Sequence, residues 1–163
     1  MKQAIELTIN GETHDLLVAP NVTLQEAIRD HVGLLGTKAG CEMGTCGACT
    51  VLLEEKPILS CITLAVECNG KKITTIEGIS DGVTLSNLQE AFVRKGGLQC
   101  GFCTPGMILS GTALLKKNPR PKVDEIKKAL EGNLCRCTGY NGIIDAVLDV
   151  AGPASPMQDE GEN

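Results

Sequence analysis

Nine cysteines constrain this 163-residue chain more than any other feature, because eight of them form two compact groups. Short, repeated cysteine spacings in a reducing compartment are typical of metal centres or redox sites rather than disulfides. The first group is Cys41, Cys46, Cys49 and Cys61, and the second is Cys100, Cys103, Cys135 and Cys137. Each half of the chain must therefore fold so that its four thiols meet.

The first group has the spacing C-x4-C-x2-C, and its fourth cysteine follows after eleven residues. This is the plant-type spacing of a [2Fe–2S] cluster. The same loop contains Gly40, Gly44 and Gly47, and glycine adopts the positive-φ conformations that let a backbone wrap an anionic cluster and aim N–H groups at sulfur. Zinc sites usually pair two short cysteine knuckles, which this segment lacks. The spacing therefore favours iron–sulfur over zinc.

The second group joins C-x2-C to C-x-C, and this spacing alone is compatible with an iron–sulfur cluster, zinc or a redox dithiol. Cys103 comes just before Thr104 and Pro105, where Thr104 is expected to cap a helix that begins with Pro105. Cys135 and Cys137 likewise precede the predicted last helix, and the positive end of a helix dipole stabilises thiolate. Position therefore favours a second cluster, with zinc and dithiol chemistry as alternatives.

Two further residues near these groups are left outside the predicted ligand sets. Cys68 is expected to be a structural or free thiol, since eight cysteines already complete two sites. Arg136 stands between two predicted ligands, where it could offset cluster charge or bond to helix-end carbonyls. Neither residue is needed to build a site.

The hydrophobic pattern divides the chain into a sheet-forming part, residues 1–78, and a helical part, residues 79–151. In the first part, Asn10-Gly11 follows alternating apolar residues and predicts a tight hairpin turn. The expected elements are the hairpin over residues 5–18, a short helix begun by a capping box at 23–26, and strands at 50–53 and 73–76. These elements predict an α+β domain.

Apolar residues recur at helical spacing in the second part and predict a four-helix bundle. The expected helices cover about residues 85–95, 104–117, 124–131 and 140–150. The remaining segment, residues 152–163, contains two prolines, two glycines and three acidic residues, and it is expected to be a mobile tail.

Composition excludes several classes of partner. The aromatic residues are Phe92, Phe102 and Tyr140, with no tryptophan, so base-stacking platforms for single-stranded nucleic acid are nearly absent. A net charge of −5 also argues against binding to phosphate backbones. No apolar run approaches the roughly 20 residues of a membrane span, and no hydrophobic leader opens the sequence. We therefore expect a cytoplasmic protein that binds no nucleic acid.

Three motifs carry a family resemblance. They are GCEMGTCGACT at residues 40–50, QCGFCTPGM at 99–107 and GNLCRCTGY at 132–140. They resemble the small iron–sulfur subunit of molybdenum hydroxylases, the xanthine dehydrogenase and carbon monoxide dehydrogenase family. YNGI at 140–143 departs from the YRPI of fused xanthine and aldehyde oxidases. LLGTK at 34–38, KKNP at 116–119 and DEIK at 124–127 are similar to the small subunit of 4-hydroxybenzoyl-CoA reductase.

The resemblance implies an N-terminal β-grasp, ferredoxin-like domain with one [2Fe–2S] cluster on the first cysteine group and a C-terminal four-helix domain with another on the second. Gln99 and Cys137 match positions that approach the molybdopterin of a large partner subunit, and the first cluster lies nearer the flavin of an FAD-binding medium subunit. The implied function is electron transfer between molybdopterin and FAD or an external acceptor, with no catalytic residues in this chain. The alternative is a free-standing two-cluster ferredoxin, which the second motif disfavours.

Overall fold

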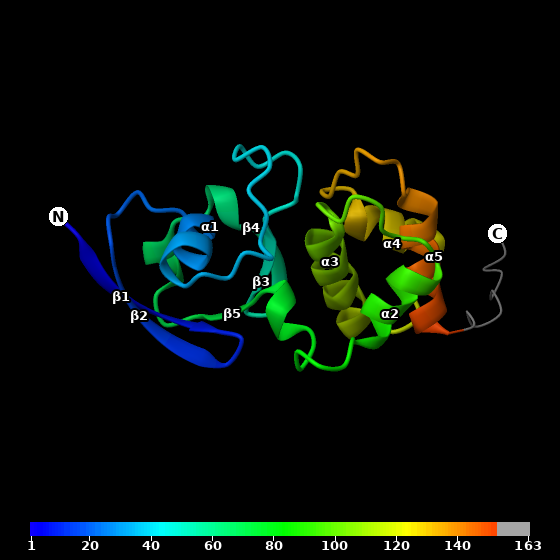
Figure 1. Cartoon of the computed structure of the whole chain (residues 1–163), viewed down its shortest axis with the longest axis horizontal. Coiled ribbons are helices and arrows are strands. Elements are labelled where there is room, and N and C mark those ends of the chain that lie inside the picture. Colours follow the sequence, from blue (N-terminus) through cyan, green and yellow to red (C-terminus); the bar gives the residue numbers. More distant parts are fainter. Residues whose placement is uncertain (153–163) are drawn as a thin grey trace, which may run out of the picture.

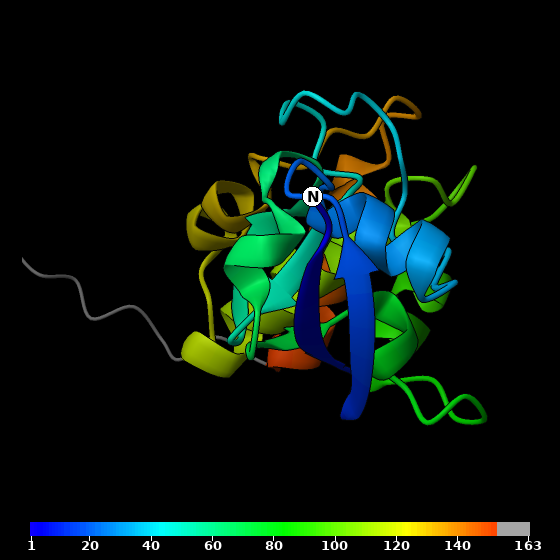
Figure 2. The same ribbon diagram turned by 90° about the vertical axis from the view of Figure 1, so that its left-hand side faces the viewer.

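The protein is described by a computed structural model that covers residues 1–152. A sheet-containing half and a helical half lie side by side along the long axis, with the N-terminus at the sheet end (Figure 1). Turned by 90°, the sheet half faces the viewer and the helices lie behind it (Figure 2). The predicted mobile tail, residues 152–163, lies outside the described residues except for Gly152, which caps the last helix.

The first half is built on a mixed five-stranded sheet in the order β2-β1-β5-β3-β4. Strands β1 (Gln3–Ile9) and β2 (Glu12–Val18) form the predicted hairpin. Asn10 and Gly11 both have positive φ, 54° and 87°, as a two-residue turn with the right twist requires. Strand β5 (Lys72–Thr74) runs parallel to β1, and β3 (Thr50–Leu53) pairs with both β5 and β4 (Lys56–Leu59).

Two strand predictions differ from the structure. The strand expected over residues 73–76 ends at Thr74, because the Asn10 side chain accepts from Thr75 N (2.9 Å) and donates to Thr75 Oγ1 (2.9 Å) in place of a neighbouring strand. The chain then turns into a 3-10 segment, η4 (Ile76–Gly78). Strand β4 was not predicted at all, since it is short, contains Pro57 and occupies the sheet edge where proline is tolerated.

The predicted capping box is present at the short helix that covers the sheet. Thr23 Oγ1 accepts from Glu26 N (3.1 Å), and Glu26 Oε2 accepts from Thr23 N (2.7 Å). The helix continues from α1 (Leu24–Glu26) into a π-helical turn, η1 (Ala27–His31). Its buried residues pack with apolar side chains of β1, including the fully buried Leu7, to form the first hydrophobic core.

Four helices form the second half, as predicted: α2 (Asn87–Arg94), α3 (Thr104–Lys117), α4 (Val123–Leu130) and α5 (Tyr140–Ala151). Helix α2 begins later than expected, because Ser86 and Gln89 form a capping box there and leave Leu85 about half exposed. Helix α3 begins at Thr104 rather than being capped by it, so that Cys103 is the capping residue. No helix in residues 1–152 is both long and apolar enough to cross a bilayer.

The helices enclose a second hydrophobic core around Phe92, Met107 and Ile143, each fully buried. Ile76 of η4 and the following Ile79 pack against this second core although they follow the sheet half. The α+β fold class predicted from the sequence is therefore confirmed, with a sheet domain and a four-helix domain in direct contact.

Candidate iron–sulfur centres

The first cysteine group comes together at the edge of the sheet domain that faces the helices. Cys41, Cys46 and Cys49 lie in the loop between η1 and β3, and Cys61 lies in a 3-10 turn, η2 (Ser60–Ile62), after β4. Cys49 and Cys61 are 2% and 6% exposed, and their thiols are within hydrogen-bonding reach of each other. Burial raises the pKa of Cys61 to about 11, so a bound cation is what would favour its thiolate form.

The same loop turns backbone N–H groups toward sulfur. The amides of Thr45 and Cys46 donate to Cys41 Sγ at 3.3 and 3.4 Å. The Thr45 hydroxyl, followed by the backbone N–H groups of the loop, lowers the pKa of Cys41 to about 5. A loop that stabilises negative charge on sulfur in this way fits an anionic iron–sulfur cluster.

Residues with left-handed backbone conformation recur directly after predicted ligands. They are Glu42 (φ 53°), Gly47 (φ 72°), Gly101 (φ 81°) and Thr138 (φ 59°), which follow Cys41, Cys46, Cys100 and Cys137. Two of them are not glycine, so the loops keep a conformation that costs free energy in isolation. Successive N–H groups in such turns form concave anion-binding surfaces.

One expectation about the loop glycines was wrong. Gly44 and Gly47 have positive φ as expected, whereas Gly40 is absent from the residues with positive φ. Packing is the constraint at Gly40 instead, since an added Cβ would lie 3.0 Å from Cys46 Sγ and 3.3 Å from the Phe102 ring.

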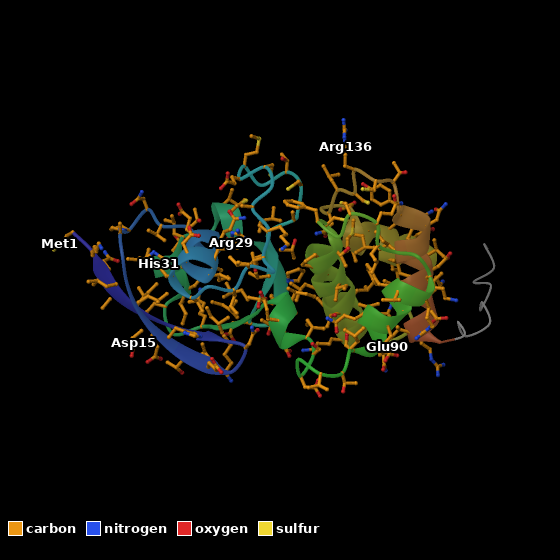
Figure 3. All side chains as sticks on the ribbon, in the orientation of Figure 1. Met1, Asp15, Arg29, His31, Glu90 and Arg136 are labelled. Carbon is orange, nitrogen blue, oxygen red and sulfur yellow. The ribbon has the colours of Figure 1, made fainter. Side chains whose placement is uncertain are left out.

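Two polar side chains brace the start of the cysteine loop, and sequence reasoning missed both. Arg29 of η1 donates to the carbonyl oxygens of Leu35 (3.2 Å) and Thr37 (2.7 Å). Arg29 is labelled in Figure 3. Gln25, which is 2% exposed, donates to Lys38 O at 2.8 Å. No signal in the sequence identified Gln25, because its burial is visible only in the structure and its partner lies thirteen residues away in a loop.

The second cysteine group lies where two helices begin. Cys103 caps α3, and Cys135 and Cys137 lie just before α5, whose capping residue Gly139 turns its N–H toward Cys135 Sγ at 3.5 Å. Burial raises the pKa of Cys103 to about 12, with the neighbouring Cys135 thiol adding to the effect. The predicted placement of this group at helix N-termini is thus what the structure contains.

The thiols of the second group approach most closely in two pairs. Cys103 lies within hydrogen-bonding reach of Cys135, and Cys100 of Cys137. Among the described residues, no three cysteine, histidine or acidic side chains converge as ligands of a single ion do. Two thiol pairs match a centre with two irons, each bonded to two cysteines, better than they match one tetrahedral zinc.

A buried donor next to this group is consistent with a sulfur-containing centre. The hydroxyl of Thr104 is buried and has no hydrogen-bond partner among the described residues. Buried hydroxyl groups nearly always have a partner, and hydrogen bonds to sulfur are one way in which proteins tune such clusters. The donor set of this site therefore fits a [2Fe–2S] cluster.

Gln99 and Cys137, which sequence reasoning placed together, are in contact. Gln99 Nε2 donates to Cys137 O at 3.1 Å, and Gln99 is exposed. Cys100 is also exposed, so this edge of the second group faces the surface. Tyr140 was missed as a site residue; its hydroxyl oxygen accepts from Cys135 N at 2.7 Å and holds the ligand loop against the first turn of α5.

The two residues left outside the ligand sets are accounted for. Cys68 is fully buried in the first core, and burial raises the pKa of its thiol, as expected for a structural cysteine. Arg136 is exposed and points away from the ribbon (Figure 3). Part of Arg136 also lines the hollow that contains cysteines of both groups.

Both groups open on one hollow between the domains. A cleft of about 640 Å³ is lined by cysteines of both groups together with apolar side chains such as Phe102 and Leu134. The two centres are therefore neighbours, although 38 residues lie between their nearest cysteines in the chain, Cys61 and Cys100.

Two sequence families match the chain, one for each half. Residues 7–74 match the family described as a 2Fe-2S iron-sulfur cluster binding domain, and residues 75–148 match a [2Fe-2S] binding domain. The chain therefore has two [2Fe–2S]-binding domains. This finding favours a [2Fe–2S] cluster in the second domain over zinc or a redox dithiol.

Relatives match nearly the whole chain. The nicotine 6-hydroxylase small subunit of Paenarthrobacter nicotinovorans is 49% identical over 148 residues, covering 91% of this chain and 89% of the relative. The xanthine dehydrogenase iron-sulfur-binding subunit of Escherichia coli O157:H7 is 50% identical, covering 89% and 92%.

Solved structures have the same fold. Quinoline 2-oxidoreductase from Pseudomonas putida 86 contains a chain that is 49% identical, with a TM-score of 0.89 and coverage of 92% of this chain and 93% of that one. Aldehyde oxidoreductase from Desulfovibrio desulfuricans ATCC 27774 is 41% identical with a TM-score of 0.88, but the match spans only 17% of that longer chain. The chain therefore belongs to the family of small, two-domain [2Fe–2S] subunits of molybdenum hydroxylases.

Proposed function

We propose that Cys41, Cys46, Cys49 and Cys61 hold one [2Fe–2S] cluster and that Cys100, Cys103, Cys135 and Cys137 hold the other. The paired thiols carry this proposal, together with the N–H groups that point at sulfur. A bound [2Fe–2S] cluster accepts and releases one electron at a time. Five of the eight cysteines, from both groups, line one cleft, while Cys49 and Cys61 are buried away from bulk solvent.

The chain is an electron-transfer subunit of a heteromeric molybdenum hydroxylase. The nicotine 6-hydroxylase small subunit matches 91% of its length, and the xanthine dehydrogenase iron-sulfur-binding subunit matches 89%. Its part in the reaction is to take single electrons from a two-electron oxidation or to supply them to the reverse. We expect no substrate-converting residues in this chain. A cytosolic location, expected from nine reduced thiols, belongs to the same proposal.

The exposed edge of the second group is proposed to face the molybdopterin-binding large subunit. Gln99 and Cys137 lie there, and both Gln99 and the adjacent Cys100 are exposed. Exposed apolar side chains near the cysteine groups, such as Phe102 (46%) and Leu134 (55%), are suited to cover by a partner. A medium subunit with FAD is proposed as the acceptor on the side of the first group.

The substrate is a property of other chains. Relatives with 40–50% identity are named for nicotine, xanthine, nicotinate, caffeine and aldehydes, so overall identity does not select one substrate. The resemblance to the 4-hydroxybenzoyl-CoA reductase branch stays a prediction.

Purification of the chain from its native host separates this function from the free ferredoxin alternative. A tagged chain is expected to bring down a large subunit with molybdenum and a subunit with FAD, at equal stoichiometry. A chain that is recovered alone with full iron content would instead be a shuttle. Gln99→Ala provides the sharper test within the complex: iron content should remain unchanged while the clusters are reduced more slowly by substrate, and unchanged reduction would remove Gln99 from the contact.

A further inference from the structure

One buried side chain joins the two cysteine groups, and nothing in the proposed function assigns it a role. Asn133 lies two residues before Cys135 and is 5% exposed. Its Nδ2 donates to Gly47 O (2.9 Å) and to Thr50 Oγ1 (3.1 Å), which lie on either side of Cys49 in the other domain. The amide nitrogen thus donates to two acceptors across the domain boundary.

The acceptor atom of the same side chain is held from its own domain. Asn133 Oδ1 accepts from Ser110 Oγ of α3 at 2.8 Å, and that bond is also buried. Thr50 Oγ1 in turn donates to Gly47 O at 2.7 Å. The bond to Gly47 O fixes the amide orientation, because a carbonyl oxygen can only accept and a flipped amide would turn Oδ1 toward it. A satisfied buried network then specifies one arrangement of the groups that it joins.

The backbones are packed against each other at this point. A Cβ on Gly106 of α3 would lie 2.5 Å from Gly47 O and 2.9 Å from Asn133 Nδ2. A Cβ on Gly47 would lie 2.2 Å from Gly132 O. Two glycines therefore permit the close approach that the Asn133 bonds hold in place.

The next residue completes the connection between the cysteine groups. Leu134 N donates to Cys46 O at 2.8 Å. Cys46 belongs to the first group and Leu134 is bonded to Cys135 of the second, so a single hydrogen bond links the main chains of two predicted ligands. The length of this hydrogen bond depends on the relative position of the two loops.

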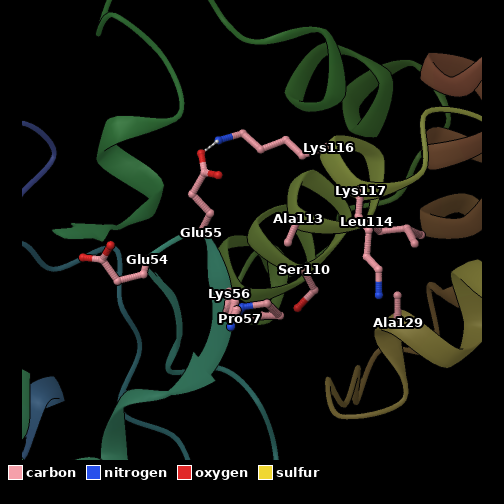
Figure 4. Close-up of a pocket in the computed structure, with 10 residues that line it drawn as sticks. All are labelled: Glu54, Glu55, Lys56, Pro57, Ser110, Ala113, Leu114, Lys116, Lys117 and Ala129. Carbon is pink, nitrogen blue, oxygen red and sulfur yellow. Dashed lines mark hydrogen bonds and ion pairs between the residues drawn. The ribbon is translucent and has the colours of Figure 1, made fainter. Parts of the chain in front are cut away.

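An ion pair across the domains is of a different kind. Lys116 Nζ and Glu55 pair at 3.0 Å on the rim of a second hollow of about 630 Å³, away from the cysteines (Figure 4). Their side chains are 55% and 77% exposed, and exposed ion pairs contribute little and are screened by salt. The buried Asn133 contacts are therefore the specific ones.

We propose that Asn133 is a positioning residue that sets the relative placement of the two cluster sites and maintains the Cys46–Leu134 hydrogen bond between them. This role rests on the proposed electron-transfer function, since placement matters only if electrons pass between the sites. Asn133 touches neither predicted cluster through a ligand atom; it acts by holding the Gly47 loop against α3.

The test uses the full chain with both clusters and compares two disruptive variants with one matched control. Asn133→Asp keeps the shape but replaces the donating amide with an acceptor that faces Gly47 O. Gly106→Ala keeps every hydrogen-bonding group and places a methyl between the loops. Gly132→Ala is the control, because an added Cβ there meets nothing within 4 Å.

Two readouts report placement rather than activity. The first is the magnetic interaction between the two reduced clusters in EPR, which depends on their separation. The second is hydrogen exchange of the Leu134 amide. Both disruptive variants should keep full iron content and two cluster signals, lose at least half of the interaction splitting, and exchange this amide about tenfold faster or more. Gly132→Ala should match the unmodified protein.

Unchanged splitting and exchange in Asn133→Asp and Gly106→Ala would overturn the proposal. Loss of iron in both variants would also overturn it, because Asn133 would then be needed to build a site rather than to place two sites. The proposed function fails separately: an unmodified chain without two [2Fe–2S] signals would refute it, while the exchange of the Leu134 amide would still report on the Asn133 contacts.

Discussion

The two cysteine groups each bring four thiols together, but they do so with different backbone elements. The first is formed by one continuous loop and a turn of the sheet domain, and its buried pair, Cys49 and Cys61, lies against the sheet. The second is formed by two separate loops that lead into α3 and α5, and its outer pair, Cys100 and Cys137, reaches the surface. Sheet and helices thus supply N–H groups to sulfur by different routes.

This difference indicates a direction for electron transfer. Cys100 is exposed, and it also lines the cleft together with Cys103 and Cys135 of its own group and two cysteines of the first group. A chain of sites that runs from a partner-facing edge through a cleft to a second domain is suited to passing electrons in series. Electron transfer in series requires two sites that form independently and are then held together.

Removal of one ligand from each group is the largest test of that independence. Cys49→Ser should abolish the N-terminal cluster and halve the iron content, while the C-terminal signal persists, because the second group takes no ligand from the first domain. Cys103→Ser should do the reverse. Metal analysis and low-temperature EPR of each variant provide the measurement, and loss of both signals in either variant would contradict independent sites.

Core truncation in each domain tests whether the domains also unfold separately. Phe92 and Leu7 are both fully buried, in the second and the first core. Phe92→Ala should cost about 3–5 kcal/mol and Leu7→Ala about 2–5 kcal/mol of the free energy of unfolding. In denaturant titrations followed by the two cluster absorptions, each substitution should move mainly its own domain's transition, and coincident shifts would indicate one cooperative unit.

Helix capping offers a matched pair of smaller effects. Ser86 caps α2 in the helical domain and Thr23 caps α1 in the sheet domain, each through a complete capping box. Ser86→Ala and Thr23→Ala should each cost about 1 kcal/mol. Thermal unfolding should place each loss in the domain that contains the cap, with Ser86→Thr restoring most of it. A loss below about 0.3 kcal/mol, which is roughly the cost of replacing a capping residue with glycine, would show that the cap does not stabilise its helix.

The smallest expected effect is electrostatic and depends on pH. Hydrogen bonding to Arg94 (2.6 Å) and the nearby Lys95 lower the pKa of Asp149 on α5. A carboxyl group with a lowered pKa stabilises the fold above its ordinary pKa, and this contribution is lost as the pH falls through the lowered value. The stability difference between the unmodified chain and Asp149→Asn should therefore be full at neutral pH and vanish in acid. A constant difference from about pH 6 to pH 2 would contradict the pairing.

Local signals predicted much of this molecule, since their partners lie a few residues away. The Asn10-Gly11 turn, the Thr23 capping box and the helical spacing of the second half were all confirmed. The cysteine spacings also predicted two centres, because ligand spacing within a loop is itself a local geometric constraint.

Features set by distant partners were not predictable in this way. Asn133 was part of a recognised motif, but its partners at Gly47 and Thr50 are 86 and 83 positions away. The early end of β5 depends on the side chain of Asn10, which follows the neighbouring strand β1 and is 65 positions away in the chain. Gly40 is constrained by its packing against Cys46 Sγ and not by a positive φ.

The most direct test of the account is iron and acid-labile sulfide analysis combined with low-temperature EPR of the reduced, unmodified chain. Two neighbouring [2Fe–2S] sites should give four irons, four sulfides and two distinct rhombic signals that interact magnetically. Zinc, or only two irons with a single signal, would contradict the assignment of the second cysteine group and with it the two-site relay.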